Sequence, residues 1–532
     1  MENILYIPPI NLRIEIRKDL EKKLRSVFAA GSYTQKEEIV EILNFIHDYH
    51  YNKICDIIRG INSKNLISFL LFQFELIENE ENLIKSQSID PIEFKEIILL
   101  LCDLIVEKKT YESSNALYFY EEEFLGRLWI HAEKVFEYAN ASNFTHRVNN
   151  TNLLLTIYPV GQQYFLEQNS IPDFNESFKE FQKSIKKNIS LRERYLKNDN
   201  LQNFIFKNIK NTINQKFKDE FGLSYLEFEF IVLDMIINSK KIKRPNDIPC
   251  ISNSLIKEFS RQIGIDVSIL EQYFNGITLY KDLFTVKGRE VWNYTQQERS
   301  RKRPLLEINY NRVTWRLFSP KMLGSRIISI EEDMVLSPLN RIPKEWVTKK
   351  IKIEFSRANT EIGNWFEKKT LELLREINIF GFKPKTKLRI SDGQIIFIDN
   401  KTGPPDFIGF SEKDNAIVII ECKLLDCIFE PKGIQSELSK FLDGDKSYIC
   451  KFENKINWVK KNFESVKKIL KQNLPLSYLE NCSSIKYCFV TYYPTILKYF
   501  YTDIPSPTIF ELLELYNENG GWPFERGTLN VK

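Results

Sequence analysis

Hydrophobic side chains recur every three to four positions through much of the first 215 residues of the chain. The segments 66–77, 94–106 and 178–195 show this spacing most clearly. It is typical of amphipathic helices, because one helical turn holds about 3.6 residues. We therefore predict an α-helical domain over residues 1–215, suited to sensing, recognition or oligomerisation.

The pattern changes between residues 216 and 348, for which we predict a mixed α/β connecting domain. Residues 252–263 and 267–273 are two short helical segments joined by a glycine-containing turn. Such a pair occurs in DNA-binding helix–turn–helix modules and, more commonly, in ordinary helical hairpins. The sequence leaves both interpretations open.

A basic run precedes a predicted β-hairpin in the same domain, in which residues 305–308 pair with 313–318. The charged side chains of the run are Arg299, Arg301, Lys302 and Arg303. Basic runs are usually solvated loops. This one has tryptophan and tyrosine side chains near it in the sequence, so contact with phosphates or with a single strand is an equally good interpretation.

The β-branched, apolar run 416–420 predicts a buried central strand. Glu421, Cys422 and Lys423 follow it directly. Side chains alternate between the two faces of a strand. Glu421 and Lys423 are therefore predicted to lie on one face of the sheet, and Cys422 on the other.

A second predicted strand, residues 406–410, begins with Asp406 and is joined to the first by the short segment 411–415. A connection of this length favours an antiparallel β-hairpin. The hairpin would bring Asp406 beside Glu421, so that two carboxylates and one ammonium group converge on one site.

The Pro-Asp pair at 405–406 followed by Glu-Cys-Lys at 421–423 resembles the signature of the PD-(D/E)xK nuclease superfamily. A helical pattern over 361–377 precedes the motif, and a predicted helix at 457–470 and strand at 485–491 follow it. Helix, hairpin, strand, helix and strand is the order of elements in the core of that superfamily. The resemblance covers roughly the last third of the chain.

This resemblance implies an α/β restriction-endonuclease-like core over residues 349–532. Together with the helical and mixed segments before it and the length of 532 residues, this predicts an α+β multidomain fold for the whole chain. It also implies hydrolysis of phosphodiester bonds with Mg²⁺, for which Mn²⁺ would substitute. In this interpretation Asp406, Glu421 and the backbone carbonyl of Cys422 bind the metal ion. Lys423 positions the attacking water and offsets charge in the transition state.

Two further residues follow from the resemblance. Glu367 matches the additional carboxylate that the superfamily's first helix supplies for a second metal ion or a metal-bound water. Glu361 and Glu372 are alternatives in the same predicted helix. Gln435, after the E-x-K strand, is a candidate for substrate contact, because some relatives use a glutamine there.

These features predict a metal-dependent DNA endonuclease, with RNA not excluded, of the restriction or anti-phage defence type and regulated by its helical N-terminal region. The alternatives are a catalytically silent nucleic-acid-binding scaffold, an RNase or junction nuclease of the same fold, and a helical interaction protein whose motif is accidental. Cleavage of two strands would favour a homo-oligomer. Because the sequence has no G-x-x-x-x-G-K-[ST] loop, unwinding would need a partner motor protein.

Composition adds few constraints. The 532-residue chain has 75 Lys and Arg against 71 Asp and Glu, so nucleic-acid binding would depend on local patches. The absence of a signal segment and of long apolar stretches predicts a cytoplasmic protein without a membrane partner. The eight cysteines lack C-x-x-C spacing, which argues against a zinc finger.

The four histidines all lie within residues 47–146. This placement excludes a histidine-based nuclease site in the C-terminal domain. His47 and His50 have the i,i+3 spacing of ligands on one helix face, but we interpret them as surface histidines.

Overall fold

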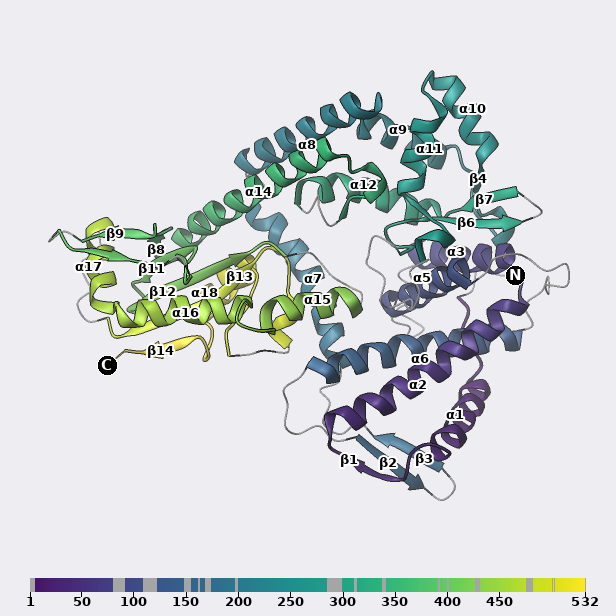
Figure 1. The fold of residues 1–532 in the computed structure, drawn as a ribbon, viewed down its shortest axis with the longest axis horizontal. Helices are drawn as coiled ribbons and strands as arrows, with labels where there is room; N and C mark the ends of the chain where they lie inside the picture. The colour runs from purple at the N-terminus through teal and green to yellow at the C-terminus, as the bar shows by residue number, and fades with distance from the viewer. Residues whose placement is uncertain are drawn as a thin grey trace. The chain divides into compact units, whose positions relative to one another are not determined.

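Figure 1 presents the computed structural model of the chain. It describes residues 5–79, 91–108, 122–147, 155–160, 163–167, 174–196, 200–284, 299–310, 313–336, 341–390, 393–399, 401–425, 431–474, 482–499, 501 and 503–531. The fold class is mixed α+β, as predicted. Among these residues no helix is long and apolar enough to cross a lipid bilayer.

The chain forms two compact units, whereas three domains were predicted. The N-terminal unit contains residues 1–174, 207–359 and 430–432, and the C-terminal unit contains residues 175–206, 360–429 and 433–532. Residues on both sides of position 215 share one core, in which Leu70 and Leu101 belong to the same buried cluster as Leu306 and Leu317. The three-domain division stays a prediction.

Helices make up most of the N-terminal unit. They are α1 (Ile10–Arg25), α2 (Lys36–Gly60), α3 (Ser63–Asn79), α5 (Pro91–Lys108), α6 (Glu122–Arg147), α8 (Asn200–Phe221), α9 (Tyr225–Ile237), α10 (Asn253–Ile263), α11 (Val267–Gly276) and α12 (Pro320–Leu336). The segments 66–77 and 94–106, predicted from their three-to-four spacing, form the central parts of α3 and α5.

Two small sheets belong to the same unit. One has the order β1-β2-β3, with β1 (Gly31–Tyr33), β2 (Leu155–Val160) and β3 (Gln163–Glu167). The other has the order β4-β7-β6-β5, with β4 (Cys250–Ser252), β5 (Thr278–Leu279), β6 (Leu305–Tyr310) and β7 (Val313–Leu317). The hairpin predicted after the basic run is confirmed, since β6 and β7 pair antiparallel.

The predicted helix pair is also present, as α10 and α11. The Ser252 hydroxyl accepts the Leu255 N–H at the start of α10, and Gly264 ends that helix with φ +70°. The positive φ favours glycine, which has no Cβ to clash. Asp266 then caps α11 by accepting the Ser268 N–H at 2.7 Å. A role for this pair in DNA binding stays a prediction.

The C-terminal unit combines a five-stranded sheet with helices (Figure 1). Its helices are α7 (Phe174–Leu196), α14 (Lys349–Glu376), α15 (Pro431–Leu442), α16 (Tyr448–Lys461), α17 (Phe463–Asn473) and α18 (Ile509–Asn519). Its strands are β8 (Ile379–Phe382), β9 (Lys387–Arg389), β10 (Ile395–Phe397), β11 (Phe407–Ser411), β12 (Ala416–Lys423), β13 (Ser484–Thr491) and β14 (Thr528–Asn530). The first residues of α14 lie in the N-terminal unit.

The strand order is β14-β13-β12-β11-β8, with β12 in the middle. The predicted hairpin is confirmed, since β11 and β12 pair antiparallel, while β12 and β13 run parallel. The β-branched residues of β12 are fully buried, because helices cover both faces of the sheet. On one face Phe452 of α16 packs 4.7 Å from Phe489, measured between ring centroids. On the other, Thr370 of α14 lies beside Cys422.

The prediction of one helix over 457–470 is wrong. The segment contains the end of α16 and the beginning of α17, separated at Asn462. Asn462 has φ −108° and ψ 24°, outside the helical range, and its backbone N–H donates to the carbonyls of Trp458 and Val459 at the end of α16.

Candidate active site

The strand register places Asp406 directly opposite Glu421. Phe407 pairs with Ile420 in the antiparallel ladder, so the residues one step further out also face each other. Residues opposite one another in such a ladder project to the same face. The Asp406 carboxylate accepts the Cys422 N–H at 2.8 Å. The hairpin therefore brings the two acidic residues together, as the sequence predicted.

Lys423 completes the predicted group. Its ammonium nitrogen lies 2.8 Å from Glu421 Oε1 and 5.0 Å from the ring centroid of Tyr448. Burial alone would lower the pKa of Lys423, but the charges of Glu421 and Asp406 raise it above its usual value. Lys423 therefore carries a positive charge at neutral pH, which suits it to stabilising negative charge.

A second lysine, Lys455, joins the group from α16. Its ammonium nitrogen lies 2.8 and 2.7 Å from the two oxygens of Glu421. Sequence analysis missed Lys455, although its spacing is a signal: it shares one helix face with the apolar residues Phe452, Ile456 and Val459. The structure shows that this face is buried. A lysine on the apolar face of an amphipathic helix requires a buried acidic partner.

Glu367 reaches the same region from α14 and forms an ion pair with Lys383, just after β8. Burial alone would lower the pKa of Lys383, but Glu367 and Asp406 raise it. Of the alternatives to Glu367, Glu361 is exposed to solvent and Glu372 pairs with Lys369. Glu367 is therefore the acidic residue that α14 contributes, and Lys383 is a further lysine that sequence reasoning missed.

We call these six residues the carboxylate–lysine cluster: Asp406, Glu421, Glu367, Lys423, Lys455 and Lys383. Burial and the charge of Glu421 raise the pKa of Asp406 to about 6, and Lys423 only partly offsets them. Within the described residues Asp406 has no hydrogen bond to a lysine, whereas Glu421 accepts three, one from Lys423 and two from Lys455. The ionised form of Asp406 is thus disfavoured in this arrangement.

The donor set is compatible with Mg²⁺. Asp406 and Glu421 offer hard carboxylate oxygens from adjacent strands, and a divalent cation would remove the repulsion that raises the pKa of Asp406. In the present arrangement Lys423 and Lys455 hold Glu421. Accordingly, among the described residues no group of three or more His, Cys, Asp or Glu side chains is arranged around a common metal position.

Gln435 lies on α15 and is exposed. Its side chain has no hydrogen bond to the cluster residues among the contacts that the structure describes. A contact with substrate at this position stays a prediction.

The side chains of the basic run are not those of a solvated loop. Each of its side chains forms an ion pair inside the N-terminal unit: Arg299 with Asp103, Arg301 with Glu96, Lys302 with Asp333 and Arg303 with Glu345. The Arg303 side chain is only 1% exposed and donates to both oxygens of Glu345, at 2.9 and 2.8 Å. The fold itself neutralises these charges, which does not favour a phosphate-binding loop, and a contact of the run with nucleic acid stays a prediction.

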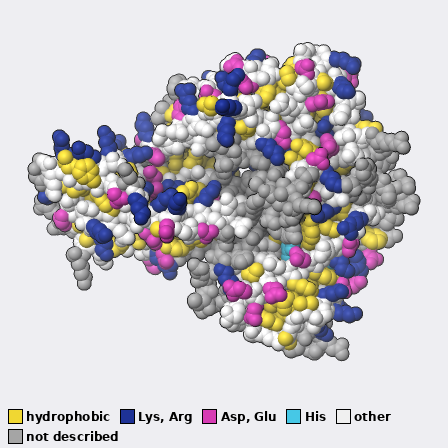
Figure 2. All heavy atoms as spheres, in the orientation of Figure 1, with side chains coloured by type: hydrophobic (Ala, Val, Ile, Leu, Met, Phe, Trp, Pro, Cys, Tyr) yellow, Lys and Arg dark blue, Asp and Glu magenta, His cyan; other side chains and the backbone are white. Residues whose placement is uncertain are grey.

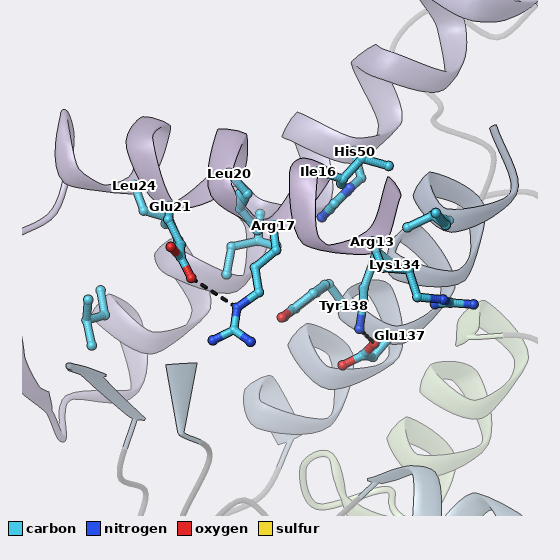
Figure 3. Close-up of a pocket in the computed structure, with 13 residues that line it drawn as sticks. Arg13, Ile16, Arg17, Leu20, Glu21, Leu24, His50, Lys134, Glu137 and Tyr138 are labelled. Carbon is cyan, nitrogen blue, oxygen red and sulfur yellow. Dashed lines mark hydrogen bonds and ion pairs between the residues drawn. The ribbon is translucent and has the colours of Figure 1, made fainter. Parts of the chain in front are cut away.

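A separate cavity of about 450 Å³ lies in the N-terminal unit among α1, α2 and α6 (Figure 3). Its basic side chains are each matched by a carboxylate: Arg13 by Glu133, Arg17 by Glu21 and Lys134 by Glu137. The remaining wall is largely apolar. This pairing leaves the cavity without a dominant charge.

His50 lines that cavity and is buried, as is His47, so the interpretation of both as surface histidines is wrong. Tight packing of α2 against α6 removes them from water. His50 Nδ1 lies 2.7 Å from His131 Nδ1. Burial lowers the pKa of His50 to about 2 and that of His131 to about 4, so both are neutral and one ring donates to the other.

Comparison with known proteins adds no constraint: no family model matches the chain, and no curated protein or solved structure shows a significant similarity to it. The interpretation of the cluster therefore rests on its residues and their geometry.

Proposed function

We propose that the chain is a metal-dependent endonuclease that hydrolyses phosphodiester bonds of DNA. The observation that carries the proposal is the register of β11 and β12, which sets Asp406 opposite Glu421 with Lys423 on the same face. Two carboxylates and a lysine at neighbouring ends of two adjacent strands are groups that metal-assisted phosphate hydrolysis uses.

In this proposal Asp406, Glu421 and the Cys422 carbonyl would hold Mg²⁺, which supplies charge neutralisation at the phosphate and lowers the pKa of a bound water. Lys423 remains protonated because Glu421 and Asp406 raise its pKa. It would stabilise the negative charge that develops on the phosphate oxygens. Glu367 would orient a water, with Lys383 fixing its carboxylate.

A catalytically silent scaffold is the second candidate, and one observation favours it. Lys455 bonds both oxygens of Glu421, so a metal ion would have to compete with a buried ammonium group for that carboxylate. In a protein that has this fold but no hydrolytic activity, the Lys455 ammonium group would serve to neutralise the buried Glu421 carboxylate. The two candidates differ in a single measurable property, which is cleavage.

The test is incubation of the purified chain with supercoiled plasmid in Mg²⁺, in Mn²⁺ and in EDTA. Asp406→Ala and Lys423→Ala are compared with Asp503→Ala and Lys446→Ala, which alter exposed residues of the same unit. We expect metal-dependent nicking or linearisation, lost in the first two variants and kept in the controls. Cleavage that survives both cluster substitutions would refute the proposed site. Absence of cleavage by folded wild-type protein would favour the scaffold.

A parallel incubation with single-stranded RNA separates a DNA endonuclease from an RNase. A role in restriction or anti-phage defence, regulation by the N-terminal unit, a cytoplasmic location, a homo-oligomer and a partner motor protein all stay predictions from the sequence.

A further inference from the structure

Strands β9 and β10 form a separate two-stranded sheet, which we call the ribbon. In its antiparallel register Lys387 pairs with Phe397, and Arg389 pairs with Ile395. Paired residues project to the same face. One face of the ribbon therefore carries Lys387, Arg389, Ile395 and Phe397.

The opposite face anchors the ribbon to the C-terminal unit. Leu388 is buried and belongs to a small apolar cluster with Ile390, Ile398 and Ile469 of α17. Because this inner face holds the ribbon in place, its outer face is presented to solvent. Lys387 and Arg389 are exposed, and Phe397 is 64% exposed.

The outer face combines cations with an aromatic ring. The Lys387 ammonium nitrogen lies 5.8 Å from the ring centroid of Phe397. In Figure 2, dark-blue Lys and Arg side chains border a yellow hydrophobic patch near the strand that Figure 1 labels β9. Asp399, the nearest described carboxylate in sequence, is occupied by the N–H groups of Lys401 and Thr402, at 2.9 and 2.8 Å.

The ribbon is continuous with the carboxylate–lysine cluster. It is inserted in the chain between Lys383 and Asp406, both of which belong to the cluster. Helix α16 joins the two regions a second time: Lys455 bonds Glu421, and one turn later the Trp458 indole N–H donates to the Phe397 carbonyl at 3.1 Å. A polymer bound at the cluster would therefore extend toward the ribbon.

We propose that the outer face of the ribbon binds a single-stranded stretch of the nucleic acid whose backbone enters the cluster. Lys387 and Arg389 contact successive phosphates, and Phe397 stacks on an unpaired base. The exposed Phe397 ring indicates a single-stranded substrate. Bases inside a duplex already stack on each other, so they offer no free face to a protruding phenylalanine. This inference rests on the proposed nuclease function and refines its substrate.

The test is binding of a fluorescein-labelled 30-nucleotide single strand to the full chain in EDTA, followed by fluorescence anisotropy over a range of salt concentrations. Phe397→Ala is compared with Phe230→Ala, a matched variant whose phenylalanine is 77% exposed in the N-terminal unit. The double variant Lys387→Gln/Arg389→Gln is compared with Lys241→Gln/Lys243→Gln, which alters two other exposed lysines.

We expect Phe397→Ala to weaken single-strand binding about tenfold, the loss of one stacked base. The ribbon double variant should reduce the slope of log affinity against log salt by about 1.4, because each lost phosphate contact contributes about 0.7 on a single strand. The two control variants should bind as wild type does.

Wild-type affinity in both ribbon variants would overturn the inference, as would equal loss of binding to a blunt duplex in Phe397→Ala. Cleavage of each preparation is measured alongside. If wild type cleaves plasmid while the ribbon variants bind normally, only the ribbon inference fails. If wild type neither cleaves nor binds, the proposed function fails with it.

Discussion

The basic run and the carboxylate–lysine cluster are both dense in charge, but the two regions distribute their ion pairs differently. In the basic run each of the four cations has a different acidic partner, and one of these partners, Asp333, also pairs with Arg326 and Arg341. In the cluster two lysines converge on Glu421, while Asp406 accepts a backbone N–H and has no lysine hydrogen bond among the described residues.

The two regions differ in how much unpaired charge each one offers to a ligand. A set of matched ion pairs satisfies its own charges, so it contributes to the fold and offers little to a phosphate or a metal ion. Burial raises the pKa of Asp103 beside the basic run and that of Asp406 in the cluster alike to about 6, so this value does not separate the two regions. What separates them is that Asp103 has the ion pair with Arg299, whereas Asp406 in the uneven set has no hydrogen bond to a lysine among the described residues. A divalent cation would relieve the charge of such a carboxylate, so charge density alone does not mark a functional site.

The largest effect is expected from Asp333→Asn in the matched region. Asp333 accepts from Lys302, Arg326 and Arg341, at 2.8, 2.5 and 3.1 Å. Loss of its charge would leave three buried cations together and lower the stability of the N-terminal unit by about 4 kcal/mol. Hydrogen exchange of α12 peptides at increasing urea concentrations measures this loss of stability. Asp56→Asn, at an exposed ion pair, is the control, and equal effects of the two would contradict the distinction.

A smaller loss, about 3 kcal/mol, is expected from Lys455→Met in the uneven region, because Glu421 keeps Lys423 as a partner. The same change removes a competitor for Glu421. We therefore expect half-maximal cleavage at a Mg²⁺ concentration several-fold lower than for wild type. Titration of cleavage against Mg²⁺ checks this. An unchanged or higher Mg²⁺ requirement would show that Lys455 does not oppose the metal ion.

Unlike the two substitutions above, Asp406→Asn should raise stability. We expect it to stabilise the metal-free C-terminal unit by about 2 kcal/mol at pH 7. The ionised carboxylate is unfavourable in the folded state, because burial and Glu421 raise its pKa to about 6. The advantage of the variant over wild type should be absent below pH 4, grow between pH 4 and 6, and level off above. Urea-dependent hydrogen exchange of β12 peptides across this range measures the difference. Destabilisation at pH 7 would mean that Asp406 is well paired.

The smallest effect is expected from Arg301→Gln. The Arg301 side chain is 34% exposed and pairs with Glu96, and such half-exposed pairs contribute less than about 1 kcal/mol. Because its charge is used within the fold, nucleic-acid affinity and its salt dependence should match those of wild type in the anisotropy assay. A smaller slope of log affinity against log salt concentration in this variant would show that Arg301 contacts phosphate.

Sequence reasoning reached the centre of the candidate site because that part is local. Asp406 and Glu421 belong to two strands joined by a short turn, and the period of two fixes which side chains share a face. It went wrong over 457–470, where an apolar period of 3.6 continues across the break at Asn462. Hydrophobic periodicity does not register a change of backbone angles at a single residue.

What the sequence determined by itself was the antiparallel hairpin and, through the hairpin's register, the placement of Asp406 opposite Glu421. Only the tertiary structure decided the partners: Lys455 from α16 for Glu421, Lys383 for Glu367, and the acidic residues that pair with the basic run. The physical reason is separation along the chain. Hydrophobic period is a property of neighbouring residues, whereas a buried ion pair exists only once packing has brought distant elements together and excluded water.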